Sequence, residues 1–546
     1  MDDNLRKLAE DNEDKKEEKE TQSQVLIRLA TGFEVFHTKE KETYATFKVR
    51  DHYETWPLKG SGFKLWLTKK YFEEYGKAAG GQGMTDALNV LNAKALFEGK
   101  EYSVFTRIAE KDNVIYIDLC NENWEVVKVD ENGWEVISNP PCKFVRSNLV
   151  KELPRPVRGG SLGELKQFIN FQYEDDWKLI VAWILAALRP GIPYPLLNIQ
   201  GEQGSAKSTT TKVIRAIVDP SQMPLRNLPK EERDLSIAAK NTWVLAFDNL
   251  SGLSNMMSDA LCKLSTGGGL ATRKLYSDDE EAVFNIIRPV ILNGIDDIAK
   301  RQDLLDRAIV ISLPSIKEEK RTDEKTFWEN FEKSHARILG ALLNVLSEAI
   351  KELPSTKLKD KPRMADFAQW VTAAEKGLEW EAGEFLTIYT QNRNEAIDQG
   401  LDSDPVAVAV QVFMQTRISW EGTAAETVAE LGRYIDERTK YSKAWPSDRK
   451  LKERLRRIAP GLRTKGIEFF DIGRTQKGAT LRLEKTGGVS SLSTPNTSIS
   501  NQVVDSVKRN GNKSVSSHDT RNQVDVNVDN EYKIPPLSNY EKSELI

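Results

Sequence analysis

Four short apolar runs punctuate the middle of the chain, and each predicts a buried β-strand. They occupy 195–200, 242–247, 288–294 and 308–314, and segments with helical spacing separate them. Near-continuous apolar strands that alternate with helices are typical of a parallel sheet covered by helices on both faces. We therefore expect a central α/β domain over 161–320.

The pattern differs on either side of this domain. Residues 24–153 contain short alternating strands and a helical stretch near 83–98, which together predict a small α+β domain. Residues 321–402 are helical throughout. The clearest helical spacing there is that of the apolar side chains Ile338, Leu342, Val345, Ala349 and Leu353, before Pro354 ends the run.

Residues 403–485 predict three helices followed by a hairpin. Asp404 precedes a proline in the order expected of a helix N-cap, Thr423 opens a capping box, and a third helix begins at Ser447. Two alternating runs meet at a turn around 473–478. Three helices and a hairpin are typical of a winged helix.

The remaining segments set the limits of the folded chain. Residues 1–23 are charged and 486–546 are rich in Ser, Asn and Thr, so we expect a disordered arm and a disordered tail. The most apolar segment, 177–188, is too short to span a bilayer and predicts a buried helix. With no apolar leader in the first residues, the sequence favours a cytoplasmic protein without a membrane partner. Taken together, these patterns predict a multidomain α/β fold.

Composition restricts the kinds of functional site that the chain could hold. Lys and Arg number 78 against 82 Asp and Glu, a net charge of −4, so any surface for nucleic acid must be local. The cysteines are Cys120, Cys142 and Cys262, with no C-x-x-C pair and few histidines. A disulfide framework or a Cys/His zinc site is therefore not expected.

A glycine-rich turn follows the strand at 195–200 and leads into a helical pattern, which is the context of a phosphate-binding loop. Backbone N–H groups at a helix N-terminus can cradle phosphate oxygens. Lys207 would neutralise the β- and γ-phosphates of ATP, and the Ser208 hydroxyl would bind Mg²⁺. A glycine-rich turn with an incidental lysine is the alternative. The candidate ATP-binding residues are Gly201, Glu202, Gln203, Gly204, Ser205, Ala206, Lys207, Ser208 and Thr209.

Ala206 stands where a glycine usually precedes the lysine of such a loop. Its methyl group lies where the backbone would approach the phosphates. We expect a helical backbone here, which tolerates alanine, so the substitution does not exclude an ATP site. The form G-x-x-G-x-A-K-S is familiar from minichromosome maintenance helicases.

Three more polar residues follow the predicted strands in order. Asp248 ends the strand at 242–247 and could hold Mg²⁺ from the other side of the phosphates. Asn293, in the next strand, could orient attacking water or sense the γ-phosphate. Arg307 precedes the last strand and could reach a neighbouring subunit's ATP. Each feature is common by itself, but the four in this order favour an ATPase whose catalytic residues are Lys207, Asp248, Asn293 and Arg307.

The segment 261–284 resembles the region between the Walker B strand and sensor 1 of superfamily 3 helicases, which are AAA+ ATPases. In that family the segment forms a hairpin in the channel of a ring, where basic residues grip DNA. The resemblance implies that Arg273 and Lys274 contact DNA, although a plain surface hairpin remains the alternative and the acidic run 277–281 would oppose DNA. The matching residues are Lys263, Leu264, Thr266, Gly267, Gly268, Gly269, Arg273, Lys274, Tyr276 and Phe284. More widely, 25–485 resembles primase- or helicase-like ATP-binding proteins of phages and integrated mobile elements.

One position departs from this family. A second acid usually follows the Walker B aspartate and polarises the attacking water, but here the residue is Asn249, which cannot accept a proton. Either another carboxylate supplies the base, with Asp278, Asp279 and Glu280 as candidates, or hydrolysis is slow.

A second basic segment lies in the predicted winged helix. Residues 445–466 place three apolar side chains on one helical face and crowd the remainder with arginine and lysine, and more basic residues follow in the hairpin. A third helix in a groove with a wing on the backbone is a common way of docking on DNA; a solvated face or a protein-binding winged helix is the alternative. The candidate contacts are Lys450, Arg454, Arg457, Arg474 and Lys477.

Three functions compete for this set of features. The first is a ring-forming, hexameric DNA helicase or replication-initiator ATPase of a phage or mobile element, with ATP and Mg²⁺ as cofactors, single-stranded DNA in the ring, duplex at the winged helix and a primase as a possible partner. The second is a DNA-bound switch, a regulator or defence protein that binds ATP without translocation, which Asn249 favours. A small-molecule phosphotransferase would explain neither the winged helix nor Asn293 and Arg307.

Overall fold

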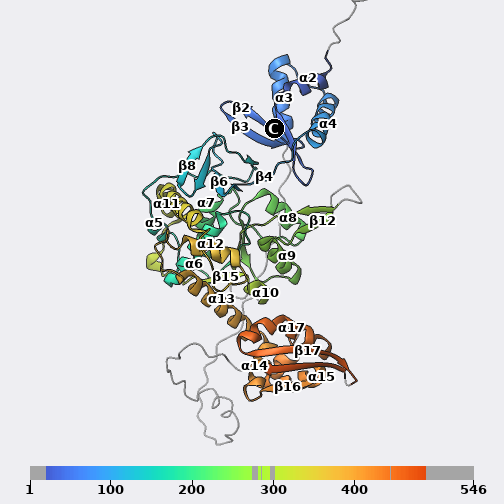
Figure 1. Cartoon of the computed structure of the whole chain (residues 1–546), viewed down its shortest axis with the longest axis vertical. Coiled ribbons are helices and arrows are strands. Elements are labelled where there is room, and N and C mark those ends of the chain that lie inside the picture. Colours follow the sequence, from blue (N-terminus) through green and yellow to red (C-terminus); the bar gives the residue numbers. More distant parts are fainter. Residues whose placement is uncertain are drawn as a thin grey trace, which may run out of the picture. The chain divides into compact units, whose positions relative to one another are not determined.

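The computed structural model describes most of the chain (Figure 1). The two ends that the sequence predicts to be disordered lie outside the described residues apart from 20–23 and 486. No helix among the described residues is long and apolar enough to cross a membrane. The described ranges are 20–273, 281–284, 286–294, 302–442, 444–476 and 478–486.

Three sheets form before residue 153 in the described part of the chain, one of them the short parallel pair of β4 and β9. A three-stranded antiparallel sheet, β1-β2-β3, packs with three helices, and the helix expected near 83–98 is α4. A four-stranded antiparallel sheet, β5-β6-β7-β8, follows it. The elements are α2 (Gln22–Leu29), β1 (Glu34–His37), β2 (Thr43–Val49), β3 (His52–Pro57), α3 (Ser61–Tyr75), α4 (Gly81–Phe97), β4 (Val104–Phe105), β5 (Ile108–Lys111), β6 (Val114–Asp118), β7 (Val126–Asp130), β8 (Gly133–Ile137) and β9 (Lys143–Phe144).

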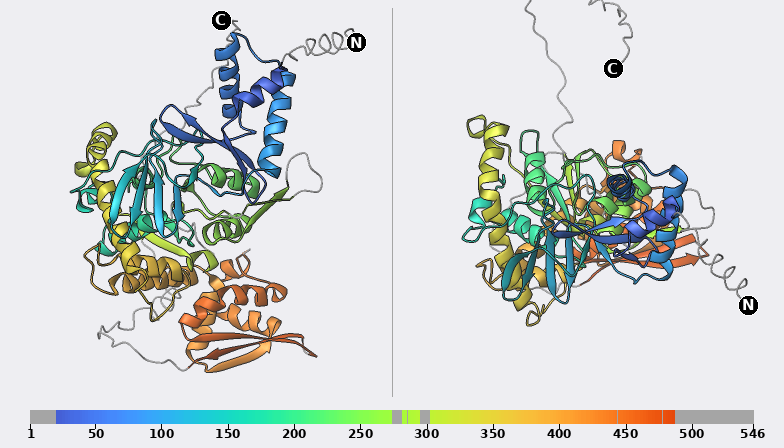
Figure 2. Two further views of the ribbon diagram at one scale, coloured as in Figure 1. Left: turned by 45° about the horizontal axis from the view of Figure 1, so that its top comes forward. Right: turned by 90° about the horizontal axis from the view of Figure 1, so that it is seen from above.

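The four-stranded sheet shares its core with the central domain. Side chains of β5 to β8 belong to the same cluster of buried residues as those of α6 and α11, and Figure 2 shows the sheet beside α11. Residues 104–150 therefore pack as part of the central body.

The four strands predicted in the middle of the chain form one parallel sheet in the order β11-β14-β10-β15. This confirms the predicted parallel sheet. Strand β11 is displaced from the apolar run, however: it extends through Asp248 to Leu250, with an irregularity in its pairing after Phe247. The elements are α5 (Gly163–Lys166), α6 (Glu174–Ala187), β10 (Leu196–Gln200), α7 (Lys207–Val218), α8 (Glu232–Asn241), β11 (Leu245–Leu250), α9 (Asn255–Thr266), β12 (Leu270–Arg273), β13 (Glu281–Phe284), β14 (Val290–Gly294), α10 (Gln302–Leu305) and β15 (Ala308–Ser312).

Helices cover both faces of this sheet, as predicted, because successive strand residues point to opposite sides. Leu197 and Ile199 of β10 pack with α6 and α7 in one buried cluster. Leu196 packs with α8 and α9 in another. The apolar segment expected at 177–188 is the buried helix α6.

A helical region and a C-terminal unit complete the described fold. The predicted caps are present: Asp404 accepts the N–H groups of Val406 and Ala407, and Thr423 forms a capping box with Glu426. The predicted hairpin is β17–β18, and a strand that the sequence analysis missed, β16, pairs with β18. The elements are α11 (Glu324–Glu352), α12 (Ala365–Ala374), α13 (Glu384–Asp402), α14 (Pro405–Gln415), β16 (Ser419–Thr423), α15 (Ala424–Leu431), α16 (Glu437–Lys440), α17 (Asp448–Thr464), β17 (Ile467–Thr475) and β18 (Gly478–Lys485).

Candidate functional site

The glycine-rich turn connects β10 to α7 and is fixed from two sides. Within the turn, buried Ser205 donates to the carbonyl of Glu202 at 2.9 Å. From outside, the Asn170 amide donates to the carbonyls of Ser205 at 2.9 Å and Pro314 at 2.7 Å. Gly201 has a φ of 146°, and a Cβ there would lie 2.7 Å from the Leu313 carbonyl oxygen, so this position requires glycine. The turn is thus rigid before any ligand binds.

The backbone of Ala206 corrects one expectation. It is not right-handed helical: φ is 61° and ψ is 29°, which is the left-handed region, and α7 begins at the next residue. An alanine in this region costs about 1–2 kcal/mol because its Cβ crowds the backbone. The turn therefore holds a strained alanine at the point where a glycine would be free of strain.

Lys207 folds back over the turn. Its Nζ donates to the carbonyls of Gly201 at 2.6 Å and Glu202 at 2.8 Å. No carboxylate within the described ranges forms an ion pair with it, so its positive charge is solvated only by neutral oxygens. An anion placed on the turn would meet this charge together with the N–H groups at the start of α7.

Four polar side chains form a continuous hydrogen-bonded chain beside Lys207. The Ser208 hydroxyl donates to Asp248 Oδ2 at 2.9 Å, and the Asn293 amide donates to Asp248 Oδ1 at 3.2 Å. The Thr211 hydroxyl donates to Asn293 Oδ1 at 2.8 Å. The structure therefore brings together Ser208, Asp248 and Asn293 from α7, β11 and β14. Thr211 was missed, and only its position one helical turn after Lys207 could have suggested it.

The oxygen atoms of Ser208 and Asp248 suit a hard cation such as Mg²⁺, which prefers hydroxyl and carboxylate oxygens. Asp248 is half-buried and forms no ion pair with any described residue, so its negative charge lacks a cation partner. Asn249 is exposed with a φ of 56°. The candidate bases, Asp278, Asp279 and Glu280, lie outside the described residues.

Arg307 does not take part in this series of hydrogen bonds. Its guanidinium forms an ion pair with Asp303, one helical turn earlier in the same polypeptide. A different arginine lies beside the turn: Arg321 Nη2 is 3.7 Å from where a Cβ of Gly204 would be. Sequence reasoning missed Arg321 because it lies 114 positions after Lys207 (321 − 207) and in no motif.

The predicted DNA contacts of the central domain are only partly described. Strands β12 and β13 form an antiparallel hairpin in which Arg273 is opposite Glu281. Lys274 lies outside the described residues.

The predicted contacts of the C-terminal unit have different surroundings. Lys450 and Arg474 are exposed. Arg454 pairs with Asp404 at 2.8 Å, and Arg457 pairs with Glu453. Lys477 lies outside the described residues.

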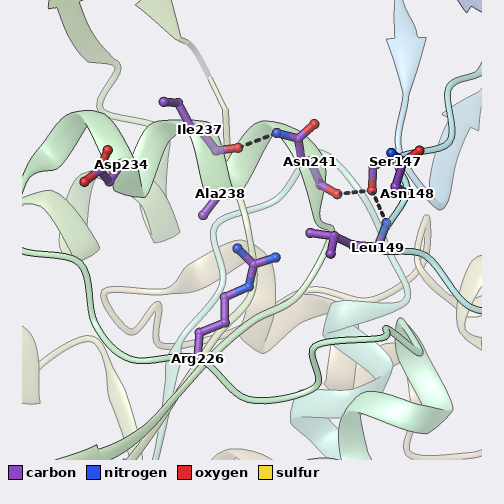
Figure 3. Close-up of a pocket in the computed structure, with 8 residues that line it drawn as sticks. All are labelled: Ser147, Asn148, Leu149, Arg226, Asp234, Ile237, Ala238 and Asn241. Carbon is purple, nitrogen blue, oxygen red and sulfur yellow. Dashed lines mark hydrogen bonds between the residues drawn. The ribbon is translucent and has the colours of Figure 1, made fainter. Parts of the chain in front are cut away.

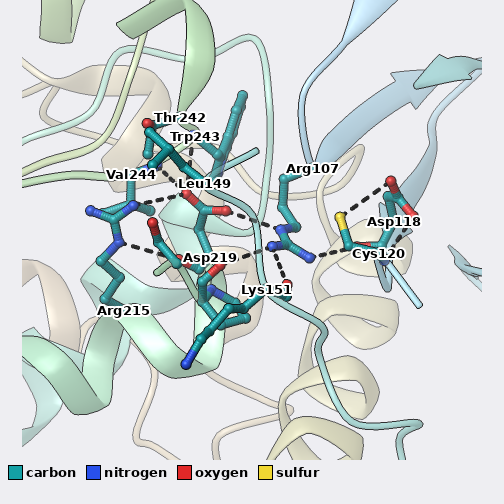
Figure 4. Close-up of polar contacts among 12 residues, drawn as sticks. Arg107, Asp118, Cys120, Leu149, Lys151, Arg215, Asp219, Thr242, Trp243 and Val244 are labelled. Carbon is teal, nitrogen blue, oxygen red and sulfur yellow. Dashed lines mark hydrogen bonds and ion pairs between the residues drawn. The ribbon is translucent and has the colours of Figure 1, made fainter. Parts of the chain in front are cut away.

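A second polar cluster, which the sequence analysis did not find, joins the β5–β8 sheet to the opposite end of α7 (Figure 4). Asp219 caps the C-terminus of α7, and Arg107 Nε donates to its Oδ1 at 3.0 Å. Its Oδ2 accepts the N–H groups of Trp243 at 3.1 Å and Val244 at 3.0 Å, just before β11. Burial lowers the pKa of the nearby Arg215 guanidinium to about 10, although Asp219 offsets part of that effect. This cluster fixes the far ends of the two elements that carry Ser208 and Asp248.

Solved structures similar to the chain include three of the apo C-terminal region of NrS-1. One is 13% identical, covers 84% of this chain and 98% of that chain, and has a TM-score of 0.37. Another is 14% identical, covers 86% of this chain and 100% of that chain, and has a TM-score of 0.36. Among the curated proteins, no relative matches the sequence.

Two family models match the sequence. The model of the actinomycete integrative conjugative element replication protein matches residues 162–383. The model of the AICE RepA C-terminal domain matches residues 406–497. The matched segments take in more than half of the chain, including the parallel sheet, the site around Lys207 and the C-terminal unit. The chain therefore belongs to the replication proteins of integrative conjugative elements, a class of mobile element.

Proposed function

We propose that this replication protein is an ATP-dependent motor, a DNA helicase or initiator ATPase that acts on the DNA of its element. The observation that carries the proposal is the series of hydrogen bonds from Ser208 through Asp248 to Asn293 and Thr211, beside Lys207. In it the glycine-rich turn lies next to a carboxylate that forms no ion pair with any described residue. That combination suits a nucleotide with its divalent metal.

Each residue has a defined role in this proposal. Lys207 and the first N–H groups of α7 bind the β- and γ-phosphates. Ser208 and Asp248 would hold Mg²⁺, which when bound neutralises the charge that develops on the phosphates. Asn293 keeps Asp248 oriented through its amide and is held in turn by Thr211, so the amide can also position water near the γ-phosphate.

The strand order supports a motor of the AAA+ or superfamily 3 kind. Strand β10, which leads into the turn, lies between β14 and β15, and β11 lies beyond β14. In such enzymes ATP lies between the subunits of a ring, so we propose a homo-oligomer, most simply a hexamer. Arg307 would act on the neighbouring subunit's ATP after exchanging its contact with Asp303.

The proposed DNA contacts follow from this arrangement. Arg273 of the β12–β13 hairpin, together with the next residue in sequence, Lys274, would hold single-stranded DNA in the ring. The C-terminal unit, with the order of helices and strands of a winged helix, would hold duplex through exposed residues such as Lys450 and Arg474. A primase is the replication partner that such a motor would serve.

A switch that binds ATP without translocation is the second candidate, and Asn249 favours it. The side chain after Asp248 is an amide that cannot accept a proton, so the motor needs a base from elsewhere. A switch needs only binding. In that case ATP would change the assembly of the protein on DNA.

The test is ATP hydrolysis by the purified chain with and without single-stranded DNA. The motor predicts strong stimulation by DNA, lost in Lys207→Ala. ATP binding with negligible turnover on any DNA would refute the motor and support the switch. Lys333→Ala, at an exposed position of α11, serves as a folded control with normal turnover.

A further inference from the structure

A pocket of about 510 Å³ lies at the outer edge of the central sheet (Figure 3). Arg226 comes from the segment paired with β11, and its side chain reaches Thr242 Oγ1 at 2.9 Å. The Arg226 carbonyl accepts the backbone N–H of Asp248 at 3.0 Å, so the pocket adjoins the strand that carries Asp248. The pocket is lined by Ser147, Asn148, Leu149, Arg226, Asp234, Ile237, Ala238 and Asn241.

Arg226 is the cation of this pocket, and it is incompletely paired. Its Nε is buried and has no hydrogen-bond partner in the described part of the chain. Burial lowers the pKa of the guanidinium, and Asp219 offsets part of that effect. No carboxylate among the described residues forms an ion pair with it. A half-buried guanidinium that forms no ion pair is a strong partner for a phosphate.

The other residues that line the pocket suit the sugar and the base of a nucleotide. Figure 3 shows α8 on one side of the pocket and residues 147–149 on the other. Leu149, Ala238 and the half-exposed Ile237 offer apolar surface for a sugar or base. The Asn241 amide donates to the Ile237 carbonyl at 2.9 Å, which leaves its side-chain oxygen as an acceptor. Asn148 is exposed. Side-chain amides such as those of Asn148 and Asn241, and carboxylates such as that of Asp234, recognise the edges of bases.

We propose that this pocket binds a nucleoside phosphate, with the phosphate on Arg226 and the base between α8 and residues 147–149. Its volume lies within the range of about 300–1,000 Å³ that is usual for small-ligand pockets. The same chemistry is offered by a free nucleotide and by one unit of a nucleic-acid strand. The proposal does not depend on the ATP site, because no lining residue belongs to it.

The test uses hydrogen–deuterium exchange of the full chain carrying Lys207→Ala, which weakens binding at the glycine-rich turn. The probes are thymidine 5′-monophosphate and a single-stranded thymidine oligonucleotide, and the readout is slower exchange in α8 and at 147–149. Arg226→Gln should remove the protection and weaken thymidine monophosphate binding by about tenfold. The matched control is Arg233→Gln, an exposed arginine of α8 that does not line the pocket.

The two probes distinguish a free nucleotide from a nucleic-acid strand as the ligand. Protection by the monophosphate alone assigns a free nucleotide, and protection by the oligonucleotide assigns a strand of nucleic acid. Ala238→Trp, which fills the pocket and leaves Arg226 in place, should abolish both effects while the melting temperature confirms folding. Absence of protection with either probe, or equal protection in the Arg226→Gln and Arg233→Gln proteins, would overturn the proposal.

Discussion

Asp219 and Asp248 lie at opposite ends of the pair formed by α7 and β11, and the groups that bond their carboxylates differ in charge. Asp219 follows α7 and is fully buried, and it is bonded by the Arg107 guanidinium and by two backbone N–H groups. Asp248 lies near the end of β11 and is bonded only by the neutral groups of Ser208 and Asn293. The charge of Asp219 is compensated within the chain, whereas no cation among the described residues forms an ion pair with Asp248.

This difference in charge compensation indicates different roles for the two aspartates. A buried carboxylate whose charge is fully compensated fixes the elements around it, and its removal leaves the partner cations uncompensated. A carboxylate whose partners in the described part of the chain are all neutral is positioned for a cation. We therefore assign Asp219 to the assembly of α7, β11 and the β5–β8 sheet, and Asp248 to metal and nucleotide.

The largest expected effect is on stability. Asp219→Ala leaves Arg107 and Arg215 buried without a carboxylate, so the free energy of unfolding should fall by about 3–5 kcal/mol. Asp248→Ala removes only bonds to neutral groups, so the loss should be about 1 kcal/mol. Urea unfolding of both variants measures the difference. Equal losses would contradict the comparison.

A smaller effect is expected at Thr211. Thr211→Val keeps the volume but removes the bond to the Asn293 side chain, which then holds Asp248 less firmly. Turnover should fall about fivefold, the value of one hydrogen bond, with ATP affinity changed less than about twofold. Steady-state kinetics checks this against Thr210→Val, a buried neighbour whose hydroxyl is not bonded to Asn293. A loss of the same size in the two variants would show that the bond does not matter.

The smallest expected effect is at the strained alanine. Ala206→Gly relieves about 1–2 kcal/mol of left-handed strain and adds about 0.5–1 kcal/mol of entropy cost, so the free energy of unfolding should rise by up to about 1 kcal/mol. Ala216→Gly, within α7, should lower it by about 1 kcal/mol. Thermal unfolding compares them, and a loss of stability in both would remove the case for strain at Ala206.

Much of the central sheet could be predicted from the sequence because the information is local. Apolar runs located four strands, and the capping box at Thr423 located the start of a helix. The same order of strands brought Ser208, Asp248 and Asn293 together, since parallel strands end at one edge of a sheet. Strand β16 escaped prediction because its five residues, Ser419–Thr423, include a glycine and only one large apolar side chain.

The missed features depend on contacts between distant residues. Arg107 and Asp219 are 112 positions apart, and neither lies in a recognisable motif. Arg226 becomes notable only because of the pocket around it. Ala206 was misjudged because a sequence pattern gives the residue but not its φ, and the tight path from the turn into α7 imposes the left-handed conformation.

The central claim is that Asp248 is positioned for a metal ion bound with ATP. Calorimetric titration of ATP into the chain, with and without Mg²⁺, tests it directly in the wild-type and Asp248→Asn proteins. The account predicts that Mg²⁺ strengthens ATP binding by at least about tenfold in the wild type, and that Asp248→Asn binds metal-free ATP but loses this gain. An Asp248→Asn protein that keeps the full Mg²⁺ enhancement would contradict the account.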